Sequence, residues 1–136
     1  MPKTKTKIKI TNSNHLIIEC LVNDVKGKFI LDSGASNSCI DLKIAKKFNL
    51  NIEESDEKAS SATNMIKHMF ISRGNKLDIN NLVKKDFEII LFDMSQINNS
   101  FREKGLESID GLVGGDILVE FKGVVSYESK TLILNT

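Results

Sequence analysis

One aspartate, Asp32, stands where an apolar, strand-like run breaks into a turn. It follows the apolar residues 29–31 and is followed by Ser-Gly-Ala-Ser. A carboxylate in that position is half buried. Burying a charge is costly unless the charge is hydrogen-bonded or paired, so such a residue needs a reason to be there. Gly34 allows backbone N–H groups close to the carboxylate, and the Ser33 hydroxyl is suited to fixing the turn. These residue types predict an oriented acid of the kind that acid–base catalysis needs.

A second segment, Leu-Val-Gly at 112–114, runs directly into Gly115 and Asp116. Together with Asp-Ser-Gly-Ala at 32–35 it resembles the retropepsin-like aspartic peptidases, in which an apolar-apolar-Gly triplet packs beside the catalytic loop. The resemblance covers about residues 16–134, including 93–107, an insertion relative to the minimal retroviral enzymes that bacterial relatives share. Asp-Ser-Gly is also ordinary turn chemistry, so a turn or capping aspartate is the structural alternative.

The resemblance implies an aspartic endopeptidase whose acid–base residue is Asp32. It also implies that Ser33 braces two catalytic loops across a dimer axis, and that Gly34 and Ala35 form the loop floor and contact the substrate backbone. Amide hydrolysis needs a base to activate water and an acid to protonate the substrate, and two close carboxylates sharing one proton supply both. The chain has a single Asp-Ser-Gly. We therefore expect a homodimer whose two-fold axis brings Asp32 against its mate.

The implied substrate is an extended polypeptide, bound as an added strand between flaps and the catalytic floor. No cofactor, metal or nucleotide is implied. The expected flap, 58–66, contains no glycine, which departs from many relatives. Terminal strands at 4–10 and 131–135 are expected in the dimer interface. The alternative function is a catalytically silent dimer that acts as a peptide-binding or adaptor module.

Other chemistries fit the sequence less well. The run 34–38 begins like the nucleophile elbow of a serine hydrolase but lacks its final glycine. The glycines of 111–115 match neither a dinucleotide fingerprint nor a Walker loop. His15 and His68 form no ligand pair for zinc, and Cys20 and Cys39 are expected to be reduced packing residues.

To hold Asp32 in place, the chain is expected to form a closed, mainly β barrel with short helices, which the resemblance identifies as retropepsin-like. Apolar runs and turn residues predict strands at 3–9, 16–22, 28–31, 77–79, 82–92, 109–115 and a hairpin at 124–134. Apolar spacing and capping residues predict helices from Asp41 through Phe48, at 95–104 and at 116–121.

Length and charge limit the remaining possibilities. A chain of 136 residues has room for one domain, 1–136. The formal charge of +1 gives no net field to gather nucleic acid or anionic lipid. The lysines of 3–9 alternate with other residues, which indicates a strand with a solvated face rather than a nucleic-acid arm. No apolar run reaches the ~20 residues of a membrane span, so a cytoplasmic protein is expected, with neither membrane nor nucleic acid as partner.

Overall fold

Six strands close into a barrel in the computed structural model, which describes residues 3–54 and 69–136. The ring of neighbours runs β3-β4-β9-β5-β8-β7, and it is closed by pairing between β3 and β7. In chain order these strands are β3 (Leu16–Val22), β4 (Val25–Leu31), β5 (Cys39–Asp41), β7 (Phe70–Ile79), β8 (Leu82–Phe92) and β9 (Gly111–Val113). Two short strands, β2 (Lys9–Ile10) and β6 (Glu53–Glu54), extend the sheet beyond the ring. The expected closed β barrel is confirmed, and the expected flap at 58–66 lies outside the described residues.

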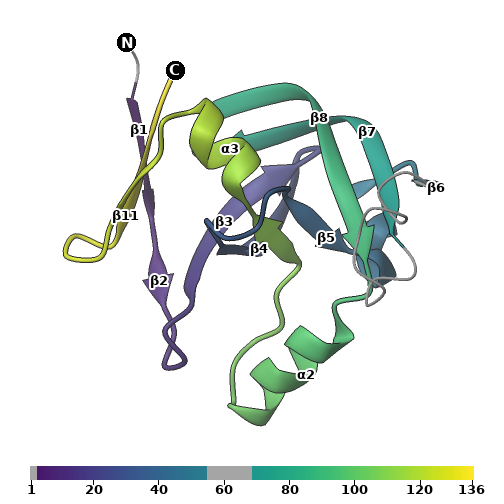
Figure 1. Ribbon diagram of the computed structural model, residues 1–136, viewed down its shortest axis with the longest axis horizontal. Coiled ribbons are helices and arrows are strands. Elements are labelled where there is room, and N and C mark those ends of the chain that lie inside the picture. Colours follow the sequence, from purple (N-terminus) through teal and green to yellow (C-terminus); the bar gives the residue numbers. More distant parts are fainter. Residues whose placement is uncertain (1–2, 55–68) are drawn as a thin grey trace.

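Asparagine-rich turns build the two long hairpins (Figure 1). Asn23 and Asp24 have φ of 51° and 67° between β3 and β4, and Asn80 and Asn81 have φ of 48° and 77° between β7 and β8. Two consecutive residues with positive φ are typical of the two-residue turns whose twist matches paired strands. Both predicted hairpins are confirmed, although β4 begins three residues earlier than the sequence suggested and β7 begins at Phe70.

In residues 3–54 and 69–136, three short helices connect the strands, as expected. The first, η1 (Leu42–Phe48), is a 3-10 helix capped by the Asp41 carboxylate and ended by Asn49 with φ of 56°. Helix α2 (Ser95–Glu103) lies outside the barrel, and α3 (Gly115–Glu120) follows β9 directly (Figure 1). Strand β9 is shorter than the expected 109–115, because Gly114 already serves as the N-cap of α3.

Strand β4 is buried on both faces, which explains its apolar end. Phe29 and Leu31 belong to the core inside the barrel, together with Phe48 and Ile117. Ile30 points the other way, into a second cluster that α2 covers with Phe101. A strand with two buried faces has no solvated side, so its sequence does not alternate.

The two ends of the chain pair with each other in a separate three-stranded sheet. Strand β11 (Thr131–Asn135) lies between β1 (Lys3–Lys7) and β10 (Val124–Ser126). The β1 lysines are exposed, so the expected strand with a solvated face is confirmed. Both ends of the chain therefore pair with each other, while the expected role of the terminal strands in a dimer interface stays a prediction. Strand β10 fills one edge of β11, and β1 fills the other.

Both cysteines are buried, as expected of packing residues. Burial, helped by the nearby carboxylates of Asp110 and Asp78, raises the pKa of the Cys20 thiol well above its usual range. The thiol is therefore protonated at neutral pH and unreactive. Across residues 3–54 and 69–136, none of the helices has both the length and the apolar character that a membrane crossing requires.

Asn23 gives a test of how the first hairpin is anchored. Its side chain donates to the Phe48 carbonyl (2.8 Å) and to Asn75 Oδ1 (3.0 Å), and it accepts from the Lys76 N–H (2.9 Å). Asn81 has the same left-handed backbone but an exposed side chain. We expect Asn23→Ala to lower the free energy of unfolding by about 2 kcal/mol more than Asn81→Ala, measured by urea denaturation. Equal losses from the two substitutions contradict the anchoring role.

Candidate active site

Strand β9 holds the end of β4, and with it Asp32. The two strands are parallel, with Phe29 opposite Gly111 and Leu31 opposite Val113. The pairing continues one step beyond β4, because the Asp32 N–H donates to the Val113 carbonyl at 2.9 Å. The backbone of Asp32 is therefore fixed by the sheet, while its side chain emerges at the point where the strand ends.

The loop after Asp32 turns tightly around its carboxylate. The Gly34 N–H donates to Asp32 Oδ1 at 2.9 Å, and the Ala35 N–H donates to the Asp32 carbonyl at 3.2 Å. A Cβ on Gly34 would lie 3.2 Å from the same carboxylate oxygen, so a side chain there crowds the acid. Asp32 is half buried, and the close approach expected of Gly34 is confirmed. Ser33 is exposed, and among the described residues its hydroxyl has no partner, so the turn is closed by Ala35 rather than by Ser33.

Gly114 lies directly beneath the loop. A Cβ at this position would lie 2.5 Å from the Ala35 carbonyl oxygen, which is closer than real Cβ contacts allow. The next residue, Gly115, donates its N–H to the same carbonyl at 2.6 Å. The Leu-Val-Gly triplet thus packs against the loop, as its resemblance to the family implied.

Hydrogen bonds between Asp116 and Ser38 hold the far side of the loop in place. The Asp116 carboxylate accepts from the Ser38 N–H at 2.9 Å and from the Ser38 hydroxyl at 2.8 Å. The Ser38 oxygen in turn accepts from the Gly114 N–H at 3.0 Å. Ser38 is buried, and buried polar groups stabilise a structure only when their hydrogen bonds are made. The sequence did not single out Ser38, because its partner is 78 positions away.

A hollow of about 600 Å³ opens in front of Asp32. Its walls are mostly apolar, with Leu112 of β9, Ile97 of α2 and Leu118 of α3 among them. Among the described residues that line it, Asp32 is the only acid. A larger groove of about 1150 Å³ lies elsewhere and does not contain Asp32. The smaller hollow is therefore the candidate active site.

The hollow brings together some predicted residues and adds others. Asp32 and Ser33 line it, whereas from the loop Gly34 donates to the Asp32 carboxylate and Ala35 to the Asp32 carbonyl. His15, which the sequence did not connect to Asp32, also lines the hollow, with its Nδ1 atom 2.7 Å from Ser13 Oγ and its ring 5.1 Å from that of Phe101. The sequence indicated only that His15 lies just before β3, and no neighbouring residue linked it to the loop after Asp32.

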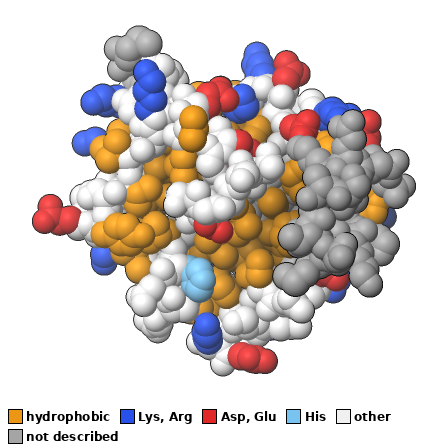
Figure 2. Space-filling model, in the orientation of Figure 1, with side chains coloured by type: hydrophobic (Ala, Val, Ile, Leu, Met, Phe, Trp, Pro, Cys, Tyr) orange, Lys and Arg blue, Asp and Glu red, His pale blue; other side chains and the backbone are white. Residues whose placement is uncertain are grey.

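Hydrophobic side chains surround this part of the surface (Figure 2). Val119, Val124 and Tyr127 are exposed by 81%, 51% and 65%. Tyr127 also lines the hollow, next to Val125 of β10. Exposed apolar residues gathered near a cavity typically mark a surface that another molecule covers.

The alternative chemistries do not fit the geometry. After Ser36 and Ser38 the chain continues as strand β5, whereas a nucleophile elbow leads into a helix. Cys39 is buried, with its Sγ 3.3 Å from the Asn37 carbonyl. In the part of the chain that the structure describes, no three His, Cys, Asp or Glu side chains converge as metal ligands would.

Comparisons with known proteins agree with this geometry. The sequence profile described as "Aspartyl protease" matches residues 18–117, which include both Asp32 and Gly114. No curated protein sequence matches the chain significantly.

Solved structures share the fold at low sequence identity. A retropepsin-like aspartic protease from Rickettsia conorii has a TM-score of 0.64 at 19% identity, covering 98% of this chain and 90% of its own. The retroviral protease-like domain of Ddi1 from Leishmania major has a TM-score of 0.60 at 16% identity, covering 90% and 89%. EIAV protease, solved with an inhibitor, has a TM-score of 0.57 at 13% identity, covering 84% and 94%. The retropepsin-like fold expected from the sequence is confirmed.

Neighbouring glycines test the contact beneath the loop. Alanine at Gly114 would place its Cβ 2.5 Å from the Ala35 carbonyl oxygen, whereas alanine at Gly115 would place it at 3.4 Å, an ordinary contact. Overpacking of this kind costs about 1–3 kcal/mol, so Gly114→Ala should lower the free energy of unfolding by that amount. Gly115→Ala should leave it nearly unchanged. If urea denaturation gives both variants the same stability, the loop does not rest on Gly114 as described.

Proposed function

Because the chain belongs to the aspartyl protease family, we propose that it is an aspartic endopeptidase that hydrolyses peptide bonds with water activated by two Asp32 carboxylates. One Asp32 comes from each chain of a homodimer. The observation that carries the proposal is the Asp32 carboxylate itself, which is fixed by β9 and Gly34 at the floor of the hollow. We also propose that residues 1–136 act as one domain.

A single carboxylate is not sufficient for this reaction. The attacking water must lose a proton and the leaving amine must gain one, at one site and one pH. Two carboxylates held close together cannot both ionise easily, so the pair keeps one proton and acts as base and acid at once. Among the described residues that line the hollow of one chain, Asp32 is the only one with a carboxylate. A second copy related by a two-fold axis supplies the other carboxylate without any further residue type.

Strand β10 is the best candidate for the contact between the two chains. It is an edge of the terminal sheet, with β11 on one side and no strand on the other among the described residues. Its residue Val124 is half exposed, although exposed sheet edges usually carry charge instead. Val125 of the same strand lines the hollow that contains Asp32. Antiparallel pairing of β10 with its mate would cover the exposed apolar residues and bring the two hollows together.

In this dimer Ser33 braces the paired loops, because its exposed hydroxyl has no partner among the described residues of its own chain. Gly34 and Ala35 form the floor under the substrate backbone. The substrate is an extended polypeptide, and the apolar walls contributed by Leu112, Ile97 and Leu118 suit apolar side chains beside the cleaved bond.

Replacement of the carboxylate tests the proposal most simply. We expect Asp32→Asn to lower cleavage of a peptide library by about 10³-fold or more, since the amide offers neither base nor acid. The dimer should persist in sedimentation velocity, because the shape of the side chain is kept. Asp86→Asn is the matched control, as Asp86 is an exposed carboxylate on β8 outside the hollow. Dimers of wild type and Asp32→Asn that are equally silent toward peptides would favour the adaptor function over the peptidase.

The proposed contact has its own test. Val124→Lys places a charge at the free edge of β10, so the dimer should dissociate at concentrations where wild type is paired, and cleavage should fall in parallel. Val83→Lys is the control, because Val83 is similarly exposed, at 45%, on β8. Sedimentation velocity measures the dimer and peptide hydrolysis the activity. An unchanged dimer in Val124→Lys rejects β10 as the interface.

A further inference from the structure

A long groove separates β1 from β3. The chain leaves β1 and continues directly into β2, which pairs with β3 through Lys9 opposite Ile17, so at this end β1 and β3 are close. Beyond that point β1 turns away to pair with β11, and the strands diverge (Figure 1). The space between them is the groove of about 1150 Å³. One end is bounded by residues of the turn between β7 and β8, and the other by residues 106–109.

The edge of β1 that faces this groove pairs with no other strand among the described residues. The Ile8 N–H donates to the Lys130 carbonyl, so even-numbered residues of β1 face β11 and odd-numbered residues face the groove. The Asn80 side chain donates to the Lys5 carbonyl from the groove side, in agreement with this alternation.

On the opposite wall, β3 is paired at both ends but not in its middle. It pairs with β2 through Ile17 and with β7 from Leu21 onward. Hydrogen bonds from the Thr11 N–H to the His15 carbonyl and from the Asn23 N–H to the Lys76 carbonyl show that odd-numbered residues use this edge. Glu19 therefore directs its peptide groups toward Lys7 of β1, with no strand between them among the described residues. Between the paired residues Ile17 and Leu21, Glu19 is thus the residue of β3 whose peptide groups face the gap.

The groove is also strongly basic, although the whole chain has a formal charge of only +1. Three carboxylates line it, Glu19, Asp78 and Glu107. Six lysines line it, namely Lys5, Lys7, Lys9, Lys26, Lys28 and Lys130.

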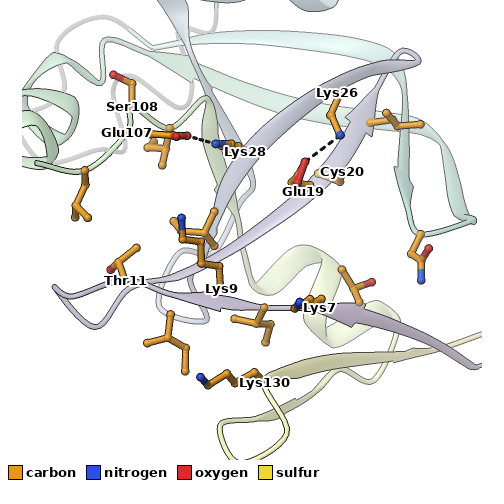
Figure 3. Close-up of a pocket in the computed structure, with 18 of the residues that line it drawn as sticks. Lys7, Lys9, Thr11, Glu19, Cys20, Lys26, Lys28, Glu107, Ser108 and Lys130 are labelled. Atoms are coloured by element: carbon orange, nitrogen blue, oxygen red, sulfur yellow. Dashed lines mark hydrogen bonds and ion pairs between the residues drawn. The ribbon is translucent and has the colours of Figure 1, made fainter.

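Two of these lysines are already paired, Lys26 with Glu19 at 3.3 Å and Lys28 with Glu107 (Figure 3). For Lys5, Lys7 and Lys130, the described residues offer no carboxylate within ion-pair distance. The groove therefore has an excess of cationic side chains.

We propose that this groove binds an acidic polypeptide segment in an extended conformation, added as a strand between β1 and β3. Its peptide groups hydrogen-bond the odd-numbered residues of β1 and Glu19 of β3, and its carboxylates meet the unpaired lysines. Main-chain pairing of this kind provides affinity, and the side chains on the rim provide selectivity. The site is separate from the hollow that contains Asp32.

A nucleic acid fits the groove less well. Single-stranded nucleic acid binds through exposed aromatic rings as well as positive charge. The aromatic residue that lines this groove is Phe101, which is 3% exposed and packs against His15. The free backbone edge of β1 favours a peptide instead.

The binding test uses a fluorescein-labelled ten-residue peptide that alternates glutamate and valine. Its anisotropy is measured with the full chain as wild type and as Asp32→Asn, and equal binding is expected because the groove does not use Asp32. Lys5→Ser with Lys7→Ser should weaken binding about tenfold. Lys85→Ser with Lys104→Ser is the matched control, since these exposed lysines lie outside the groove. Equal affinity of the two double variants overturns the site.

Folding and strand addition are checked separately. The variants should unfold at the wild-type temperature, and Lys130→Ser, which changes a turn residue, replaces the Lys5 and Lys7 pair if they do not. A peptide N-methylated at every second residue keeps its charge but loses backbone donors, so it should bind about tenfold more weakly. Equal binding of the methylated peptide overturns strand addition. Stronger binding of a single-stranded ten-nucleotide DNA than of the acidic peptide overturns the polypeptide partner.

Discussion

The parallel pairing of β4 with β9 is the contact on which the candidate site depends. It joins two segments that are far apart in the sequence, and its last hydrogen bond runs from the Asp32 N–H to the Val113 carbonyl. Gly114, which follows Val113, leaves room for the loop that carries Gly34 and Ala35. Without this pairing the carboxylate would still end a strand, but the backbone of Asp32 would lose its hydrogen bond to Val113.

Much of this site could be predicted because its signals are local. Asp32, its apolar approach and Gly34 are adjacent in the sequence, and the asparagine turns at 23–24 and 80–81 mark the hairpins directly. Contacts between distant segments could not be predicted in the same way. The Ser38 and Asp116 pair, and the position of His15 in the hollow, depend on how the barrel closes.

The terminal strands show a second limit of prediction from sequence, which concerns the choice of partner strand. Alternating residues identify β1 as a strand but do not say which edge it joins, since any free edge offers the same backbone groups. The structure pairs it with β11 of its own chain. The predicted length of strand β9 was also too long, because the contacts of the residue before it involve a distant segment. Asp110, just before it, accepts the Lys28 N–H through its carboxylate, where a regular ladder would use a backbone carbonyl.

The two cavities have different lining residues and different chemical character. The hollow has one carboxylate, apolar walls and an exposed apolar edge at β10, which suits a site completed by symmetry. The groove between β1 and β3 is basic and complete within one chain. Both are bordered by the turn before β3, since Asn12 lines the groove and Asn14 the hollow. Activity of the proposed dimer should also depend on protein concentration, because dissociation of the two chains removes the proposed site.

Subunit mixing tests the shared dyad most directly. Wild type is mixed with increasing amounts of Asp32→Asn at a concentration where both are dimeric, and cleavage is expressed per wild-type chain. If each active site needs one Asp32 from each chain, random exchange with an equal amount of the variant should lower this activity to about one half, as the symmetry of a two-chain site requires. Activity per wild-type chain that stays constant at every ratio, with exchange verified, would show that one chain contains a complete active site.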